Sequence, residues 1–174
     1  MTTFSRNRLL GLALAALIFI ADQALKWYVT GPLALREVGD QIVINPIFNL
    51  TRTNNYGISL GMLTARSVEM RWLLVAMTAA IALVVLVWLL RERKLGDVVP
   101  LGMVLGGALG NIRDRAVFGH VIDYADLHFG SFQPFLVFNL ADAAITIGVV
   151  MILASSFLIR EKRGDEAGAP ATEI

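Results

Sequence analysis

Four long apolar segments dominate the sequence and restrict the folds that it can form. They are Leu9–Tyr28, Trp72–Leu90, Val98–Ile112 and Phe135–Ile159. A helix needs about 20 apolar residues to cross a hydrocarbon core of about 30 Å, and the first, second and fourth segments meet that length. The third has about 15 residues before Arg113 and Asp114, or roughly 22 Å of helix. We therefore predict an all-α membrane protein with four transmembrane helices, of which the third ends inside protein.

The composition agrees with a polytopic membrane protein. Hydrophobic residues make up 56% of the 174 residues, charged residues make up 17%, and the net charge is +1. So small a net charge gives no indication of a nucleic-acid partner. The absence of Cys excludes disulfides, thiol catalysis and cysteine metal sites. We expect helices over about 9–28, 72–90, 98–115 and 135–159 in one domain spanning 1–163, followed by a disordered cytoplasmic tail over 164–174.

Basic residues near the helix ends predict the orientation. They precede the first helix, fill the second connection and follow the fourth helix: Arg6, Arg8, Arg91, Arg93, Lys94, Arg160, Lys162 and Arg163. Such clusters mark the cytoplasmic side of a membrane protein. An even number of crossings places all of them on that side, so both termini are predicted to be cytoplasmic. Residues 29–71 and 113–134 then face outward.

The two outward connections are predicted to be ordered. Gln41–Leu50 is rich in β-branched residues and is interrupted by Asn45-Pro46, a turn signal. Another turn candidate follows at Asn54-Asn55. We expect a small extracytoplasmic β-sheet or hairpin there. Val117–Pro134, which contains glycines and aromatic residues, is expected to form a re-entrant or interfacial segment rather than a regular helix.

Four aspartates lie on or between the last two apolar segments: Asp114, Asp123, Asp126 and Asp142. A carboxylate inside an apolar run is costly unless it faces protein or a wet cavity, so each one indicates a functional site. Asp142 would share a helical face with Asn139 and Thr146, three residues before and four after it. We expect this polar face to point into the bundle. A cluster of structural hydrogen bonds is the alternative explanation.

The connection between Asp123 and Asp142 contains a Gly and a Pro that can fold it back onto the fourth helix. Two carboxyls brought together in this way can perform acid–base hydrolysis. No local sequence feature distinguishes Asp126 from Asp123. The choice of Asp123 as the partner of Asp142 therefore depends only on its position in the chain.

Two further polar groups indicate buried ion pairs. Asp114 and Arg115 are expected to form or support an ion-pair network at the outer end of the third helix, beside Asn111. Asp22 and Lys26 are four residues apart in the first helix and would pair there. A structural role is the favoured interpretation for both groups.

Other chemistries fit the sequence less well. His120 and His128 are the only histidines, and no H-E-x-x-H pattern exists, so a zinc peptidase is disfavoured. Ser59 or Ser131 could use only Lys26 as a base, and no pattern supports such a pair.

A small ion- or proton-coupled transporter is the second candidate function. The polar residues gather at the outer ends of the helices, and the second helix has no ionisable residue between Arg71 and Arg91. A proton path would need polar groups toward the cytoplasm, so transport is disfavoured. We interpret the second helix as a lipid-facing scaffold.

Several motifs together resemble the signal peptidase II family. They are Asp22-Gln23-x-x-Lys26, Asn55-Tyr56-Gly57, the run Gly106–Arg115, Val121–Tyr124 and Phe138–Ile145. The motifs span Asp22 to about Gly148, which is most of the chain. The resemblance implies a four-helix inner-membrane aspartyl endopeptidase that cleaves a prolipoprotein just before its diacylglyceryl-modified cysteine.

The resemblance also implies roles for particular residues. It assigns catalysis to Asp123 and Asp142. Residues that shape or support the site would be Asn111, Asp114, Arg115, Asn139, Asn55, Gly57, Asp22 and Lys26. One departure is visible, because the family usually continues Ala-Ala-Phe where this chain has Ile58-Ser59-Leu60. We expect that departure to affect packing over the substrate more than the chemistry.

The expected mechanism needs no metal or organic cofactor. Two neighbouring carboxyls should share one proton, so that one activates water while the other protonates the scissile carbonyl. Which aspartate plays which role stays open. The expected partners are lipid-modified prolipoproteins and membrane lipid. The protein is expected to be a monomer with its site toward the periplasm.

Overall fold

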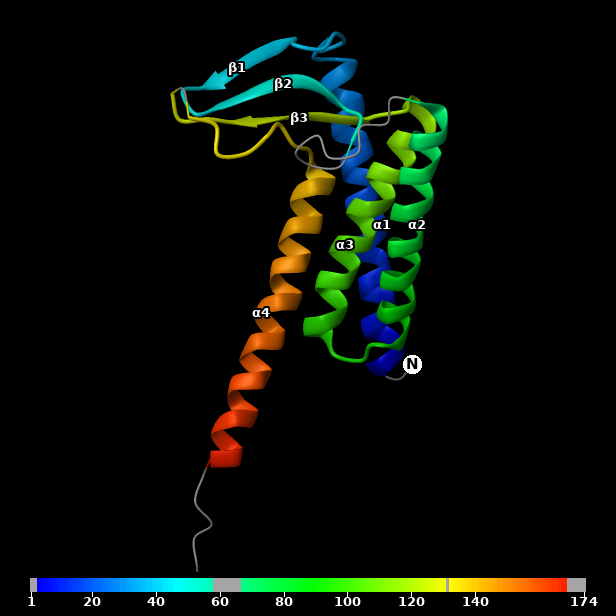
Figure 1. Ribbon diagram of the computed structural model, residues 1–174, viewed down its shortest axis with the longest axis vertical. Helices are drawn as coiled ribbons and strands as arrows, with labels where there is room; N and C mark the ends of the chain where they lie inside the picture. Colours follow the sequence, from blue (N-terminus) through cyan, green and yellow to red (C-terminus); the bar gives the residue numbers. More distant parts are fainter. Residues whose placement is uncertain (1–2, 58–66, 131, 169–174) are drawn as a thin grey trace, which may run out of the picture.

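The computed structural model describes residues 3–57, 67–130 and 132–168. In chain order, its helices and strands are α1 (Thr3–Thr30), β1 (Gln41–Asn45), β2 (Phe48–Asn55), α2 (Val68–Arg91), α3 (Leu95–Phe118), β3 (Val121–Leu127) and α4 (Leu140–Gly168). The strands form a small sheet across one end of the helices, and the N-terminus and the α2–α3 connection lie at the other end (Figure 1). Both predicted outward connections therefore lie at the same end, as expected for an even number of crossings.

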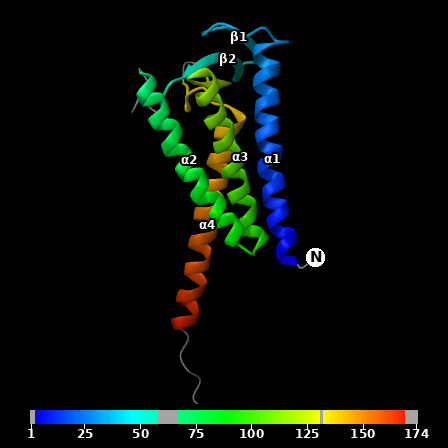
Figure 2. The same cartoon turned by 90° about the vertical axis from the view of Figure 1, so that its right-hand side faces the viewer.

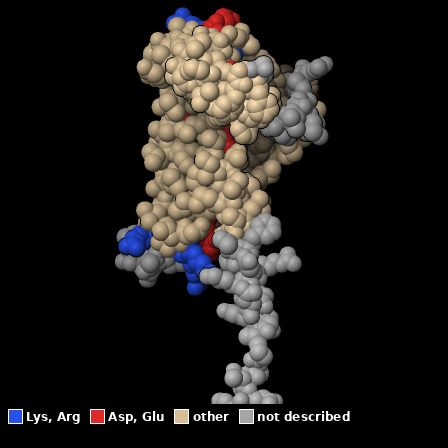
Figure 3. Space-filling view, turned by 90° about the vertical axis from the view of Figure 1, so that its left-hand side faces the viewer, with Lys and Arg blue, Asp and Glu red and all other residues tan. Residues whose placement is uncertain are grey.

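Three helices are long and apolar enough to cross a membrane: Arg6–Thr30, Val68–Arg91 and Leu95–Phe118. The prediction of a short third helix was wrong, because α3 begins earlier, at Leu95, and continues beyond Asp114. It ends at Gly119, whose φ of 83° is the left-handed conformation typical of a residue following a helix. On the face drawn in Figure 3, most Lys, Arg, Asp and Glu residues lie toward the two ends of the molecule, and other residue types cover most of the surface between them.

The fourth predicted helix was placed too early, at Phe135. Phe138 forms an isolated β-bridge with Ala125 of β3, so the backbone before α4 runs as an extended segment. The side-chain oxygen of Asn139 then accepts a hydrogen bond from the Asp142 N–H at 2.9 Å, and the Asp142 carboxylate accepts one from the Asn139 N–H at 3.4 Å. This reciprocal cap starts the helix at Leu140.

Within the part of α4 whose side chains are described, the apolar stretch is Leu140–Ser156, shorter than the other three spans, so a fourth crossing stays a prediction. Beyond it, α4 continues to Gly168, into the segment predicted to be a disordered tail. Residues 169–174 lie outside the described part of the chain.

The sheet is antiparallel, with strand order β1-β2-β3. The predicted turn at Asn45-Pro46 is confirmed as the connection between β1 and β2. The turn predicted at Asn54-Asn55 is wrong, since both residues pair with β3. Where a re-entrant or interfacial segment was expected, Val121–Leu127 forms β3, an edge strand whose β-branched start pairs with β2.

Helix α3 is the centre of the bundle and packs against α1, α2 and α4 (Figures 1 and 2). Small residues allow this close approach. A Cβ on Gly106 would lie 2.5 Å from the carbonyl oxygen of Ala15 in α1, and one on Gly107 would lie 2.4 Å from that of Ala141 in α4. Over the described residues, α2 and α4 do not contact each other.

Candidate active site

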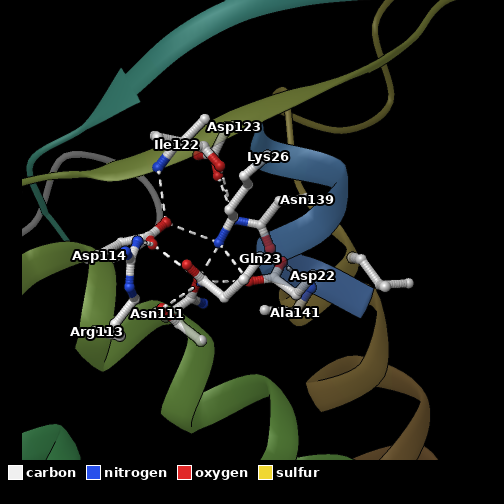
Figure 4. A network of polar contacts seen from close by, with 12 residues as sticks. Asp22, Gln23, Lys26, Asn111, Arg113, Asp114, Ile122, Asp123, Asn139 and Ala141 are labelled. Carbon is white, nitrogen blue, oxygen red and sulfur yellow. Dashed lines mark hydrogen bonds and ion pairs between the residues drawn. The ribbon is translucent and has the colours of Figure 1, made fainter. Parts of the chain in front are cut away.

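A buried ion network lies where α1 meets α3 (Figure 4). The Lys26 ammonium is 2.8 Å from a carboxylate oxygen of Asp22 and 2.8 Å from one of Asp114, and both aspartates are fully buried. The predicted pairing of Asp22 with Lys26 is therefore present. Asp114 uses Lys26 rather than Arg115, with which it forms no ion pair within 4.0 Å in the described chain.

The same network holds the backbone next to both candidate catalytic aspartates. The second oxygen of Asp22 accepts a hydrogen bond from the Ala141 N–H, at 3.1 Å, in the first turn of α4. Asp114 accepts one from the Ile122 N–H, at 3.3 Å, in β3. Ala141 precedes Asp142, and Ile122 precedes Asp123. Lys26 therefore joins the two carboxylates that position the two elements of the site.

Two asparagines connect the candidate catalytic carboxylates. The Asn139 amide donates to Asp123 at 2.6 Å, and the Asn111 amide donates to Asp142 at 2.8 Å. Asn139 also donates to the side-chain oxygen of Asn111 at 3.3 Å. Asn55, at the end of β2, adds another hydrogen bond to Asp123. The structure therefore brings Asp123 and Asp142 together around the side chains of Asn111 and Asn139. With Asn55, these are three of the predicted supporting residues.

The environment of Asp123 favours its protonated form. Burial and the negative charge of Asp142 raise the pKa of Asp123 to about 7. Hydrogen bonds from Asn55 and Asn139, and the charge of Lys26, act in the opposite direction. A carboxyl with a pKa near neutrality beside a second carboxyl is typical of an acid–base pair.

Strand geometry separates Asp126 from Asp123. Alternate residues of a strand point to opposite faces, and the two aspartates are an odd number of positions apart in β3. Asp126 accepts hydrogen bonds from the Thr51 hydroxyl at 2.9 Å and from Gln133 at 3.2 Å. It is therefore part of a separate polar group on the sheet.

Arg115 joins the C-terminal end of α3 to the backbone that follows β2. Its Nη2 donates to the Gly57 carbonyl oxygen at 2.8 Å. Arg71 of α2 in turn donates to the carbonyl oxygens of Arg115, at 2.8 Å, and Ala116. No sequence pattern indicates this contribution from Arg71. The departure at Ile58-Ser59-Leu60 lies outside the described residues.

An open, mostly apolar groove reaches the site from the side of the bundle. Residues of α2, α3 and α4 line it: Thr78, Ile81, Val104, Ala108, Asn111, Arg115 and Ile145. Thr78 and Ile81 of α2 contribute to this groove. Most of the large apolar side chains of α2 are exposed, which agrees with its interpretation as a lipid-facing scaffold. The predicted polar face of α4 was wrong at Thr146, which is exposed while its neighbour Ile145 lines the groove.

The described residues contain no cluster of three His, Asp or Glu arranged to hold a metal ion. The polar groups of the site are instead carboxylates, amides and cations that bond to one another.

The comparisons with known proteins decide the family. Residues 14–158 match the family model described as signal peptidase (SPase) II. The chain belongs to this family. It is 49% identical over 163 residues to a lipoprotein signal peptidase of Sphingopyxis alaskensis, covering 94% of each chain. It is 52% identical over 159 residues to that of Rhizorhabdus wittichii, covering 91% of this chain and 92% of the relative.

Two solved structures described as bacterial membrane enzymes have a similar fold. One gives a TM-score of 0.74 at 26% identity and covers 94% of this chain and 93% of its own. The other gives 0.70 at 29% identity and covers 83% and 90%. Membership in the SPase II family identifies this chain as a protease, a hydrolase, of the bacterial inner membrane.

Proposed function

We propose that this chain is an aspartic endopeptidase that removes signal peptides from lipid-modified prolipoproteins, with Asp123 and Asp142 as its catalytic pair. The observation that carries the proposal is the bridge between the two carboxylates, in which Asn139 donates to Asp123 and to Asn111, and Asn111 donates to Asp142. The names of the relatives, lipoprotein signal peptidases, support the substrate class.

The proposed reaction is hydrolysis without a covalent intermediate. The pair holds one proton, because two adjacent carboxylates cannot both ionise readily. The ionised aspartate takes a proton from water, whose oxygen attacks the scissile carbonyl carbon. The protonated aspartate donates to the carbonyl oxygen as negative charge develops there. Proton transfer to the amide nitrogen then releases the signal peptide and the new amino terminus.

The groove supports a substrate that stays partly in lipid. An apolar signal peptide can lie along Ile81, Val104 and Ile145, while the bond to be cut reaches Asn111 and the catalytic pair. The acyl chains on the cysteine need not leave the bilayer. We propose that cleavage occurs just before that cysteine, by a monomer, at the periplasmic face.

The catalytic pair is tested with purified protein and a lipidated prolipoprotein, by the mass of the products. Asp123→Asn and Asp142→Asn should each abolish cleavage while the proteins keep the thermal stability of a folded enzyme. Asp126→Asn is the matched control from the same strand and should retain substantial activity. If Asp126→Asn is inactive and Asp123→Asn is active, the catalytic aspartate lies on the opposite face of β3 and the proposed pair is wrong.

The orientation is tested separately with topology reporters. A reporter fused after Arg163 should give a cytoplasmic signal, and one inserted near Gly39, before β1, should give a periplasmic signal. A cytoplasmic signal at Gly39 would place the sheet and the catalytic pair on the wrong side for exported substrates.

A further inference from the structure

Arg52 occupies an irregularity in the sheet next to the catalytic pair. Leu50 pairs with Ala125 and Thr53 pairs with Asp123, so the two residues between them in β2 oppose Tyr124 alone. This is a β-bulge, which places an extra residue in one strand and redirects its side chain. Arg52 lies in this bulge, next to Thr53, which pairs with Asp123.

The Arg52 guanidinium is buried without its full set of hydrogen bonds. The residue is only 7% exposed, and its Nε and Nη1 atoms have no hydrogen-bond partner within the described structure. Buried donors in proteins are almost always paired, and a guanidinium stays charged under all ordinary conditions. Two buried donors on one permanent cation therefore indicate a missing acceptor.

The electrostatic surroundings place this cation on the side of the sheet that faces the site. Burial lowers the pKa of Arg52, while the charges of Asp114 and Asp123 act in the opposite direction. Arg115 acts on the same aspartates from α3, and its Nε also lacks a partner in the described chain. The carboxylate oxygens of the site are bonded, so the unpaired buried donors beside them belong to the two arginines.

The charge balance of the cluster indicates what kind of acceptor fits. Four carboxylates face three buried cations and one shared proton, which gives a neutral cluster. Arg113, 3.7 Å from Asp114, is left out of this count because its side chain is 44% exposed. The carboxylates are Asp22, Asp114, Asp123 and Asp142, and the cations are Lys26, Arg52 and Arg115. An anionic ligand would add an uncompensated negative charge beside those carboxylates, whereas a carbonyl oxygen would accept the hydrogen bonds without adding charge.

We propose that Arg52 is a substrate-binding residue whose guanidinium donates hydrogen bonds to carbonyl oxygens of the lipidated substrate beside the scissile bond. This inference rests on the proposed function. Two parts of such a substrate supply carbonyl oxygens, the peptide backbone and the acyl esters of the diacylglyceryl group. The role is binding, since the proton transfers belong to the aspartates.

The test measures kcat and KM for Arg52→Gln and Arg52→Lys on two forms of one prolipoprotein peptide. One form carries a diacylglyceryl cysteine, and the other carries a dialkyl ether analogue without ester carbonyls. Arg52→Gln should raise KM at least about tenfold on the diacyl form, with a smaller change in kcat, because it removes charged hydrogen bonds to substrate. Arg52→Lys keeps the charge and should recover part of the affinity.

Arg36→Gln is the matched control, because it removes the same charge from an exposed position in the same outer layer. It should leave KM unchanged. Thermal unfolding in detergent establishes that each variant is folded, and Arg52→Lys provides a second variant that retains a buried cation.

The two substrate forms identify the acceptor. If the KM increase of Arg52→Gln is equal on both forms, the acceptor is a peptide carbonyl, and if it disappears on the ether form, the acceptor is an acyl ester. The inference is overturned if both Arg52 variants keep the parent KM, or if only kcat and its pH profile change. Failure of the parent enzyme to cleave the diacyl form would instead refute the proposed function.

Discussion

Removing the charge of Lys26 should destabilise the protein more than any other single change of a basic residue in the described helices. Its ammonium is 3% exposed and lies 2.8 Å from both Asp22 and Asp114. Lys26→Met leaves two carboxylates buried without their cation. Breaking a buried ion pair by removing one partner costs about 3–5 kcal/mol, and we expect a loss in that range.

A double-mutant cycle distinguishes this arrangement from a pairing of Asp114 with Arg115. Asp114→Asn keeps the shape of the side chain and its acceptor for the Ile122 N–H, but removes one negative charge. In the Lys26→Met background it should therefore recover part of the loss, with a coupling of about 1–3 kcal/mol. Asp114→Asn combined with Arg115→Gln should show less coupling, since no ion pair joins them.

The assay is thermal or denaturant unfolding in detergent, together with activity per folded molecule. Lys94→Met is the control, because Lys94 is exposed at the start of α3 and its loss should change stability little. Additive effects of Lys26→Met and Asp114→Asn would refute the shared network. Strong coupling between Asp114 and Arg115, without coupling between Lys26 and Asp114, would also refute it.

Three further predictions follow from the site and the packing. Because the pKa of Asp123 is raised from 3.8 to about 7, its contribution to stability is complete below pH 3.8 and is lost as pH rises through 7; unfolding measured across pH 4–8 should show a decline that Asp123→Asn lacks. Gly106→Ala should cost about 1–3 kcal/mol in an unfolding assay, because its Cβ would lie 2.5 Å from the Ala15 carbonyl oxygen, whereas Gly96→Ala, with nothing within 4 Å, should be neutral. Asn139→Ser keeps a capping oxygen but loses the amide that donates to Asp123, Asn111 and the Ile122 carbonyl oxygen, so it should fold with a lower stability than the parent and cleave slowly, and a fully active Asn139→Ser would contradict the bridging role.

The helices were predictable because length and hydropathy depend on local sequence alone. The start of α4 could not be predicted in this way, because the apolar residues from Phe135 onward have the composition of a helix. Their conformation is decided by the bridge between Phe138 and Ala125 and by the cap at Asn139. The bridge depends on β3, which the sequence analysis had interpreted as a re-entrant or interfacial segment, whereas the cap is a local contact between Asn139 and Asp142.

Within the site, local spacing found the residues but not their partners. The i,i+4 pairing of Asp22 with Lys26 follows from helix geometry. The contact between Lys26 and Asp114 joins two helices, and no sequence pattern indicates it. The distinction between Asp123 and Asp126 could have been made earlier, since alternation along a β-strand separates them once that segment is recognised as a strand.

The separation of α2 from α4 has a consequence for how this enzyme must be assayed. With no contact between these helices in the described chain, the groove beside α3 is open at the side of the bundle. If the helices cross the membrane as proposed, that side faces hydrocarbon rather than water. Encounters with substrate then take place in two dimensions, and the governing concentration is the mole fraction of substrate in the lipid. Adding empty vesicles or detergent at fixed substrate and enzyme should slow turnover by surface dilution. Apparent constants quoted per litre would then differ between laboratories for the same protein.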